Sequence, residues 1–104
     1  IGLFANQMVG YVQIDCAFIG AASINSRFNV LTPSMDKVTL KRTVLANAER
    51  SFLVADSSKF NRKALMKINN LGDYDGVIST RLFTQEERSR LDRLGVRLIP
   101  VGRG

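Results

Sequence analysis

Apolar runs alternate with segments of helical period along the chain, a pattern typical of strands joined by crossover helices in a parallel sheet. Short apolar runs predict the strands, because a strand buried on both faces is apolar throughout. The predicted strands cover residues 14–19, 51–55, 76–79 and 96–101. The predicted helices cover residues 3–11, 35–49 and 84–94. The sequence therefore predicts an α/β protein of three layers, with a mostly parallel sheet and flanking helices.

Single residues mark some of the element ends. Thr84 with Glu87 three positions later forms a capping box that opens the last helix, and Gly95 closes it. Pro100 places the final strand at a sheet edge. Two segments are less regular. Residues 63–69 fit either one helical turn or a short edge strand, and the stretch from Gly20 to Pro33 is a connection rich in Gly, Ala, Ser and Asn.

The composition is that of one ordinary soluble globular domain, with 104 residues, 45% hydrophobic and 23% charged. The chain has no run of 18 apolar residues and no signal-peptide pattern, so we expect a cytoplasmic protein without a membrane span. Histidine is absent, which excludes histidine-based and metal-dependent catalysis. The single cysteine, Cys16, lies in an apolar strand and is expected to pack there as a small hydrophobe. We expect neither a cofactor nor a metal ion.

The net charge of +6 raises the question of a nucleic-acid partner, since clustered cations neutralise phosphates. The cations are scattered, however. The densest groups are Lys59, Arg62, Lys63 and Lys67, and a second set of Arg88, Arg90 and Arg93 mixed with acids. A charge-laced surface helix explains the second set without a partner. Direct binding of DNA or RNA by this chain is therefore not expected.

The segment after the predicted strand 51–55 carries the most chemistry. An apolar run breaks there into Asp56, two serines and two cations. In open α/β sheets, ligands lie beyond the carboxyl ends of the strands. Hydroxyl donors such as Ser58, with charge from Lys59 and Arg62, suit a phosphate ester. The alternative is a simple turn, in which Asp56 and the serines hydrogen-bond their own backbone.

A lysine falls on the apolar side of the predicted helix 35–49. At about 100° per residue, Lys41 lies between Leu45 and Ala48. Its long stem can cross apolar surface to reach water. Alternatively it points into a cleft, where an anion or an acidic partner would offset the cost of removing its charge from water.

Taken together, these residues resemble the carboxyl-terminal effector domain of DeoR-type bacterial transcription regulators. The resemblance covers nearly the whole chain, on residues 15–20, the Lys41-Arg42 pair, residues 55–62 and residues 77–101. It implies a fold related to ribose-5-phosphate isomerase and glucosamine-6-phosphate deaminase, incomplete at its amino-terminal side. Residues 1–104 would then be the carboxyl-terminal part of a single effector-binding domain, and the DNA-binding domain would be absent from this chain.

The resemblance also implies a function. A phosphorylated sugar or polyol would bind and modulate operator binding by a separate helix-turn-helix domain, so the chain would be a sensor and not an enzyme. DNA would be a partner only through that other domain. Apolar surface meant for missing strands would favour a homo-oligomer.

The ligand-binding residues that the resemblance implies are Gly20, Asn25, Lys41, Asp56, Ser58, Lys59 and Arg62. The chain departs from the family pattern at Ser23, Asn25, Asn29, Lys37 and Thr80.

Two other functions stay open. The same fold hosts isomerases, so the chain could be a fragment of a small sugar-phosphate isomerase-like enzyme. Its acid–base candidates would be Asp56, Asp15 and Lys41, with no second carboxylate spaced to work with Asp56. The third possibility is a fragment whose only activity is protein association.

Overall fold

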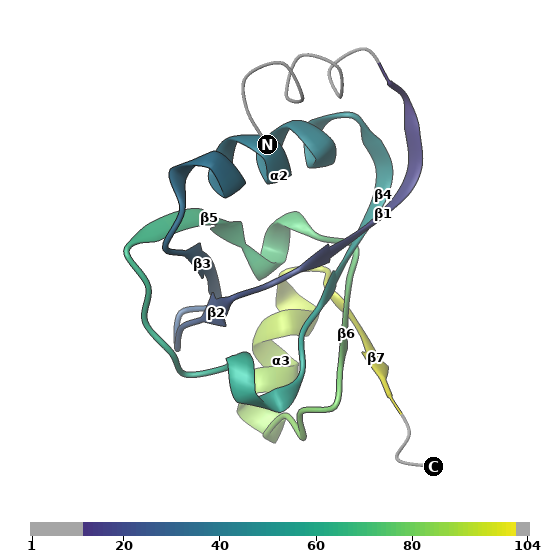
Figure 1. Cartoon of the computed structure of the whole chain (residues 1–104). Helices are drawn as coiled ribbons and strands as arrows, with labels where there is room; N and C mark the ends of the chain where they lie inside the picture. The colour runs from purple at the N-terminus through teal and green to yellow at the C-terminus, as the bar shows by residue number, and fades with distance from the viewer. Residues whose placement is uncertain (1–11, 102–104) are drawn as a thin grey trace.

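The computed structural model describes residues 12–101 (Figure 1). In chain order its elements are β1 (Ile14–Gly20), β2 (Ser23–Ile24), β3 (Asn29–Thr32), α2 (Met35–Ala46), β4 (Ala48–Val54), β5 (Met66–Asn70), β6 (Gly76–Ser79), α3 (Gln85–Arg93) and β7 (Arg97–Pro100). Two single turns of 3-10 helix, η1 (Ser57–Lys59) and η2 (Leu71–Asp73), follow β4 and β5. The helix predicted for residues 3–11 lies outside the described residues.

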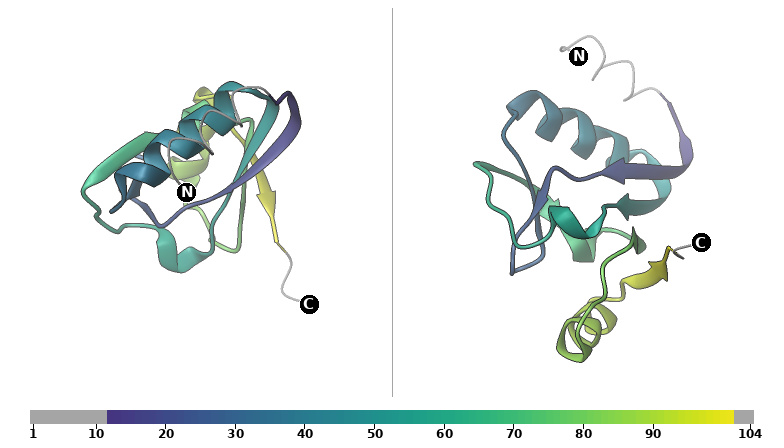
Figure 2. Two further views of the ribbon diagram at one scale, coloured as in Figure 1. Left: turned by 45° about the horizontal axis from the view of Figure 1, so that its top comes forward. Right: turned by 60° about the horizontal axis from the view of Figure 1, so that its bottom comes forward.

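Four parallel strands form the main sheet in the order β1-β4-β6-β7. Because successive strands are neighbours and parallel crossovers are right-handed, all the connections lie on one face of the sheet. Figures 1 and 2 show α2 and α3 together on that face. The predicted α/β class, the parallel sheet and its flanking helices are confirmed. Within residues 12–101, all the elements that connect the strands of the main sheet pack on this one face.

A second sheet, of antiparallel strands in the order β2-β3-β5, packs under α2 (Figure 1). Its first two strands lie in the segment expected to be an irregular connection. The turn between them is held by Asn25, whose side-chain oxygen accepts the N–H groups of Arg27 and Asn29, each at 3.0 Å. Residues 63–69 were predicted to form either one helical turn or a short edge strand. The structure has a strand there, β5.

The core lies between the two sheets and α3. Its fully buried side chains include Ile24, Phe28, Leu53, Ile68, Leu71, Val77 and Leu91. Along the main sheet, the row Ile19, Leu53 and Val77 faces this core. The alternate positions face the other side, where Phe18 is 63% exposed and stacks on Phe52 with ring centroids 5.7 Å apart. None of the described elements covers this second face.

The predicted boundaries between the helix α2 and the strand β4 are wrong. The helix predicted to reach residue 49 ends at Ala46, and β4 begins at Ala48 instead of Ser51. Pairing with β1 draws these residues into the sheet, with Ala48 opposite Ile14, so the tertiary partner overrides local helix preference. The capping box of α3, its closing Gly95 at φ 75° and the edge position of β7 are confirmed.

Candidate functional site

A hollow of about 520 Å³ lies where β1 and β4 end. The chain leaving β1 (residues 20–22) and the chain leaving β4 (residues 54–56) form its backbone walls, and Lys37, Lys41 and Lys59 surround it. We call it the lysine hollow. It occupies the position at which open α/β sheets bind ligands, beyond the carboxyl ends of adjacent parallel strands.

Lys41 reaches from α2 to the end of β1. Its Nζ donates a hydrogen bond to the carbonyl oxygen of Gly20 at 2.5 Å. Burial, and then the charge of Lys37, lowers the pKa of Lys41 below its usual value. Lys41 and Asp56 therefore line the same hollow, and the role of Lys41 in binding a ligand there stays a prediction. Ala48, expected beside Lys41 on the helix, belongs to β4.

Asp56 lines the hollow and also caps η1. Its carboxylate accepts the hydroxyl of Ser58 and the backbone N–H of Ser58, the latter at 2.9 Å. The hydrogen bond from the Ser58 hydroxyl has the largest effect on the pKa of Asp56, followed by the bond from the Ser58 N–H. Together with the charge of Lys59, they hold this pKa below its usual range. The turn expected as the alternative for this segment is thus present. It leaves Asp56 ionised at the wall of the hollow.

The predicted residues divide into two groups. Gly20, Lys41, Asp56 and Lys59 are brought together in the lysine hollow, whereas Asn25, Ser58 and Arg62 do not line it. The Ser58 hydroxyl is bonded to Asp56.

Arg62 and Asn25 have local partners instead. Arg62 donates from Nη1 to the carbonyl oxygen of Ser58 at 3.4 Å, and its backbone N–H donates to that of Ile24. The Asn25 side chain holds the β2–β3 turn.

Lys37 is the charged residue of the hollow that the predicted set lacks. It lies four positions before Lys41, so both side chains leave the same face of α2. That spacing was visible in the sequence. Arg42 has a structural role: it ties α2 to β5 by donating from Nε to the carbonyl oxygen of Ile68 at 2.7 Å and from Nη2 to that of Lys67 at 3.0 Å.

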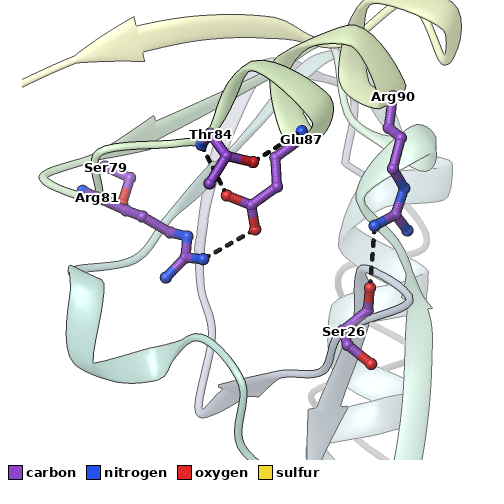
Figure 3. Close-up of polar contacts among 6 residues, drawn as sticks. All are labelled: Ser26, Ser79, Arg81, Thr84, Glu87 and Arg90. Atoms are coloured by element: carbon purple, nitrogen blue, oxygen red, sulfur yellow. Dashed lines mark hydrogen bonds and ion pairs between the residues drawn. The ribbon is translucent and has the colours of Figure 1, made fainter.

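The loop after β6 contacts η1 through a hydrogen bond. The backbone N–H of Ser57 donates to the hydroxyl of Thr80 at 3.2 Å. Next along the loop, the guanidinium of Arg81 lies over the ring of Phe60, 4.9 Å from its centroid, and pairs with Glu87 of α3 at 2.8 Å (Figure 3). These contacts connect the turn that carries Lys59 to the start of α3.

Glu87 is held on both sides. Its carboxylate accepts the backbone N–H of Thr84 at 2.9 Å and the guanidinium of Arg81 (Figure 3). Partial burial acts to raise its pKa, but these hydrogen bonds outweigh burial, so the pKa lies below its usual value.

The charges of the lysine hollow suit an anion. Three lysines and one aspartate line it, and the carboxylate of Asp56 is already hydrogen-bonded to Ser58. Asp56 is the one acidic residue in the lining, so the hollow holds no pair of carboxylates. Among residues 12–101, no group of three or more Cys, Asp or Glu side chains is placed to hold a metal ion.

A model of the DeoR C-terminal sensor domain matches residues 1–81. The chain belongs to this family. The match includes every residue that lines the lysine hollow. The family is one of sensor domains, so the DeoR assignment places the chain with regulators and not with enzymes.

Known relatives of this DeoR chain are regulators. An uncharacterized HTH-type transcriptional regulator of Haemophilus influenzae is 28% identical over 101 residues, 97% of this chain and 39% of that protein. The HTH-type transcriptional regulator YgbI of Escherichia coli K12 is 34% identical over 79 residues, 76% of this chain and 31% of that protein. The glycerol-3-phosphate regulon repressor of the same strain is 27% identical over 77 residues, which are 74% of this chain and 31% of that protein.

The chain spans between three and four tenths of the length of these relatives. In the part of the chain that the structure describes, no helix is both long and apolar enough to cross a membrane.

Proposed function

We propose that this chain is the effector-sensing part of a transcriptional repressor of sugar catabolism and that its lysine hollow binds a phosphorylated sugar or polyol. The observation that carries the proposal is the excess of two positive charges around the hollow. A phosphate monoester carries a charge of roughly −1.5 to −2 at neutral pH, which matches this excess. The position beyond the ends of β1 and β4 supports the same ligand class.

Each residue of the hollow has a role in the proposal. Lys41 and Lys59 come from α2 and η1, so they approach a bound phosphate from different elements. Lys37 adds charge from the same face as Lys41. Asp56 has unused acceptor capacity and would accept a sugar hydroxyl. The predicted roles of Ser58, Arg62 and Asn25 would each require the side chain to reach the hollow, which none of the three lines in this structure.

The names of two relatives agree with this ligand class. Glycerol-3-phosphate, which occurs in the name of a repressor in Escherichia coli and in Haemophilus influenzae, is a phosphorylated polyol. In our proposal, effector binding modulates an operator complex that is made by a separate helix-turn-helix domain, in the cytoplasm. A homo-oligomer is part of the proposal, and the exposed sheet face around Phe18 supports it.

Calorimetric titration with matched pairs of compounds tests the proposal. Glycerol-3-phosphate and glycerol form one pair, and hexose phosphates with their parent hexoses form others. We expect measurable binding by phosphorylated members only, with inorganic phosphate as a weak competitor. If a sugar binds as well without its phosphate as with it, the lysine hollow does not recognise a phosphate and the proposal fails.

A further inference from the structure

A second basic hollow lies between α3 and the turn that joins β2 to β3. Its volume is about 290 Å³ and its lining is Arg27, Asn70, Arg90, Arg93 and Leu94. We call it the arginine hollow. It shares no lining residue with the lysine hollow.

Arg90 is held in place at the rim of the arginine hollow. Its guanidinium lies 4.2 Å from the centroid of the Phe28 ring, and Nη1 donates to the carbonyl oxygen of Ser26 at 3.2 Å (Figure 3). Phe28 is only 2% exposed, so the surface under the guanidinium is part of the core. A guanidinium has five N–H donors, and Ser26 occupies one of them, so Arg90 keeps donors for a ligand.

The opposite rim has a fixed backbone. The N–H of Arg27 donates to the side chain of Asn25, and the carbonyl oxygen of Arg27 accepts Asn70 Nδ2 at 3.0 Å. Asn70 in turn caps η2, where its side-chain oxygen accepts the N–H of Gly72. Arg27 is therefore presented by a turn that side-chain hydrogen bonds hold on both sides.

The charges in this hollow are not balanced locally. Arg90 and Arg93 are three residues apart and share one face of α3. No carboxylate is in the lining, and within residues 12–101 the one ion pair is Arg81 with Glu87. Asp92, which the sequence places between these arginines, lines a different hollow. Of the acids of α3, Glu87 pairs with Arg81 and Asp92 lines a different hollow, so neither stands in the lining beside Arg90 and Arg93.

We propose that the arginine hollow is a second oxyanion site that binds a phosphate group. Planar guanidinium forks from two elements match the oxygens of a phosphate and hold it by paired hydrogen bonds. The volume is at the lower limit of ligand pockets, which favours a phosphate group over a whole nucleotide. The group is either a free phosphate or a phosphodiester in a nucleic-acid backbone, which present the same oxygens.

NMR titration of the protein with inorganic phosphate and pyrophosphate tests the site. The ionic strength is held constant with sodium chloride, so that screening does not imitate binding. We expect saturable shifts in the amide signals of residues 27, 70, 90 and 93. The double variant Arg27→Gln with Arg93→Gln should weaken pyrophosphate binding about tenfold or more, because two charge-assisted contacts are lost.

Three controls make this result specific. Arg88→Gln removes the same charge from α3 outside the arginine hollow and should change pyrophosphate binding less than about twofold, since a distant exposed charge is screened. Arg90→Lys keeps the charge but loses the fork, so it should weaken binding without altering the fold. Lys41→Met changes the lysine hollow and should leave the shifts of residues 27, 70, 90 and 93 unchanged. This result would separate the arginine hollow from the proposed effector site.

Two results would overturn the proposal: shifts that never saturate, or an Arg88→Gln variant that loses as much affinity as the double variant. A mixed-sequence DNA duplex identifies the source of the phosphate. Displacement of pyrophosphate by the duplex from the parent protein assigns the site to phosphodiesters. A duplex that does not compete with bound pyrophosphate assigns it to free phosphate.

Discussion

Replacing Lys41 with methionine removes one ammonium group from the lysine hollow and keeps most of the stem that packs on α2. The side chain has two roles in the structure, a hydrogen bond from Nζ to the carbonyl oxygen of Gly20 and a positive charge at the wall of the hollow. The first role concerns stability and the second concerns the ligand. The two are separable because they affect different measurements.

The size of each effect follows from the contacts. A hydrogen bond to a charged group contributes roughly 1.5–3 kcal/mol, so losing one lysine contact to a phosphate should weaken effector binding by roughly 10- to 150-fold. The lost bond to Gly20 costs stability. Methionine, however, no longer holds a charge in a partly buried place, and this offsets the loss. We expect the free energy of unfolding to change by less than about 1 kcal/mol.

The assay compares the parent, Lys41→Met and Lys63→Met by calorimetric titration and by thermal unfolding. Lys63 is an exposed lysine outside the hollow, so its variant makes the same charge change elsewhere. It should bind the effector almost as the parent does. Equal binding by the parent and Lys41→Met would refute the role of Lys41. Equal losses in both variants would show that net charge, and not the hollow, governs binding.

The pH dependence gives an independent check. In the folded protein the pKa of Lys41 lies below its ordinary value of 10.5, so between the two values the unfolded chain binds more protons. Stability should therefore rise with pH across that alkaline window in the parent, and less so in Lys41→Met. Affinity for a phosphate should fall over the same range as Lys41 loses its charge. A parent whose effector affinity does not change through this window would contradict the proposed contact.

The structure supports further predictions. Gly76→Ala should destabilise the fold by roughly 1–3 kcal/mol in denaturant titrations, because the new Cβ would lie 2.8 Å from the Phe52 ring and 3.0 Å from the carbonyl oxygen of Arg97; an unchanged midpoint would show that the ring moves away freely. Thr84→Ala should cost about 1 kcal/mol by the same measurement, as it removes the cap of α3. Because the pKa of Glu87 is lowered when folded, its contribution is present above the ordinary pKa of 4.5 and is lost as pH falls through the lowered value. In Glu87→Gln the free energy of unfolding should therefore fall less steeply as the pH is lowered than it does in the parent. An equal pH dependence in the two proteins would contradict this. Gel-shift titrations at physiological salt should show no sequence-selective retention of DNA by this chain, and selective retention below micromolar concentration would contradict it.

The main sheet and α3 were predictable because their signals are local. Each parallel strand is a short apolar run, and Thr84, Glu87 and Gly95 mark the ends of α3 within a few residues. The second sheet has no such signal. Strand β2 is two residues long, and its turn depends on Asn25 accepting backbone N–H groups, which composition alone does not distinguish from an irregular loop.

The lysine hollow was predictable in part, for a similar reason. A strand that ends in Asp56 and Lys59 indicates a ligand edge, and this pointed to the right end of the sheet. Lys37 was missed because a lysine on a helix resembles any surface lysine until its neighbours are known. Arg62 was expected in the hollow but follows Asn61, whose φ of 57° redirects the chain. Its role in binding stays a prediction.

Among residues 12–101, the lysine and arginine side chains that form hydrogen bonds within the fold donate mostly to backbone carbonyls, and this has a consequence for what the protein binds. Lys41 donates to Gly20, Arg42 to the carbonyls of β5, and Arg90 to Ser26. A carbonyl oxygen satisfies an N–H donor but carries no net charge, so each of these bonds fixes the position of a cation without neutralising it. A carboxylate would have done both, and in the described part of the chain one arginine, Arg81, has such a partner. The positive potential therefore persists at both hollows after the fold has formed, and a phosphate that enters meets one cation already in place in each, Lys41 or Arg90.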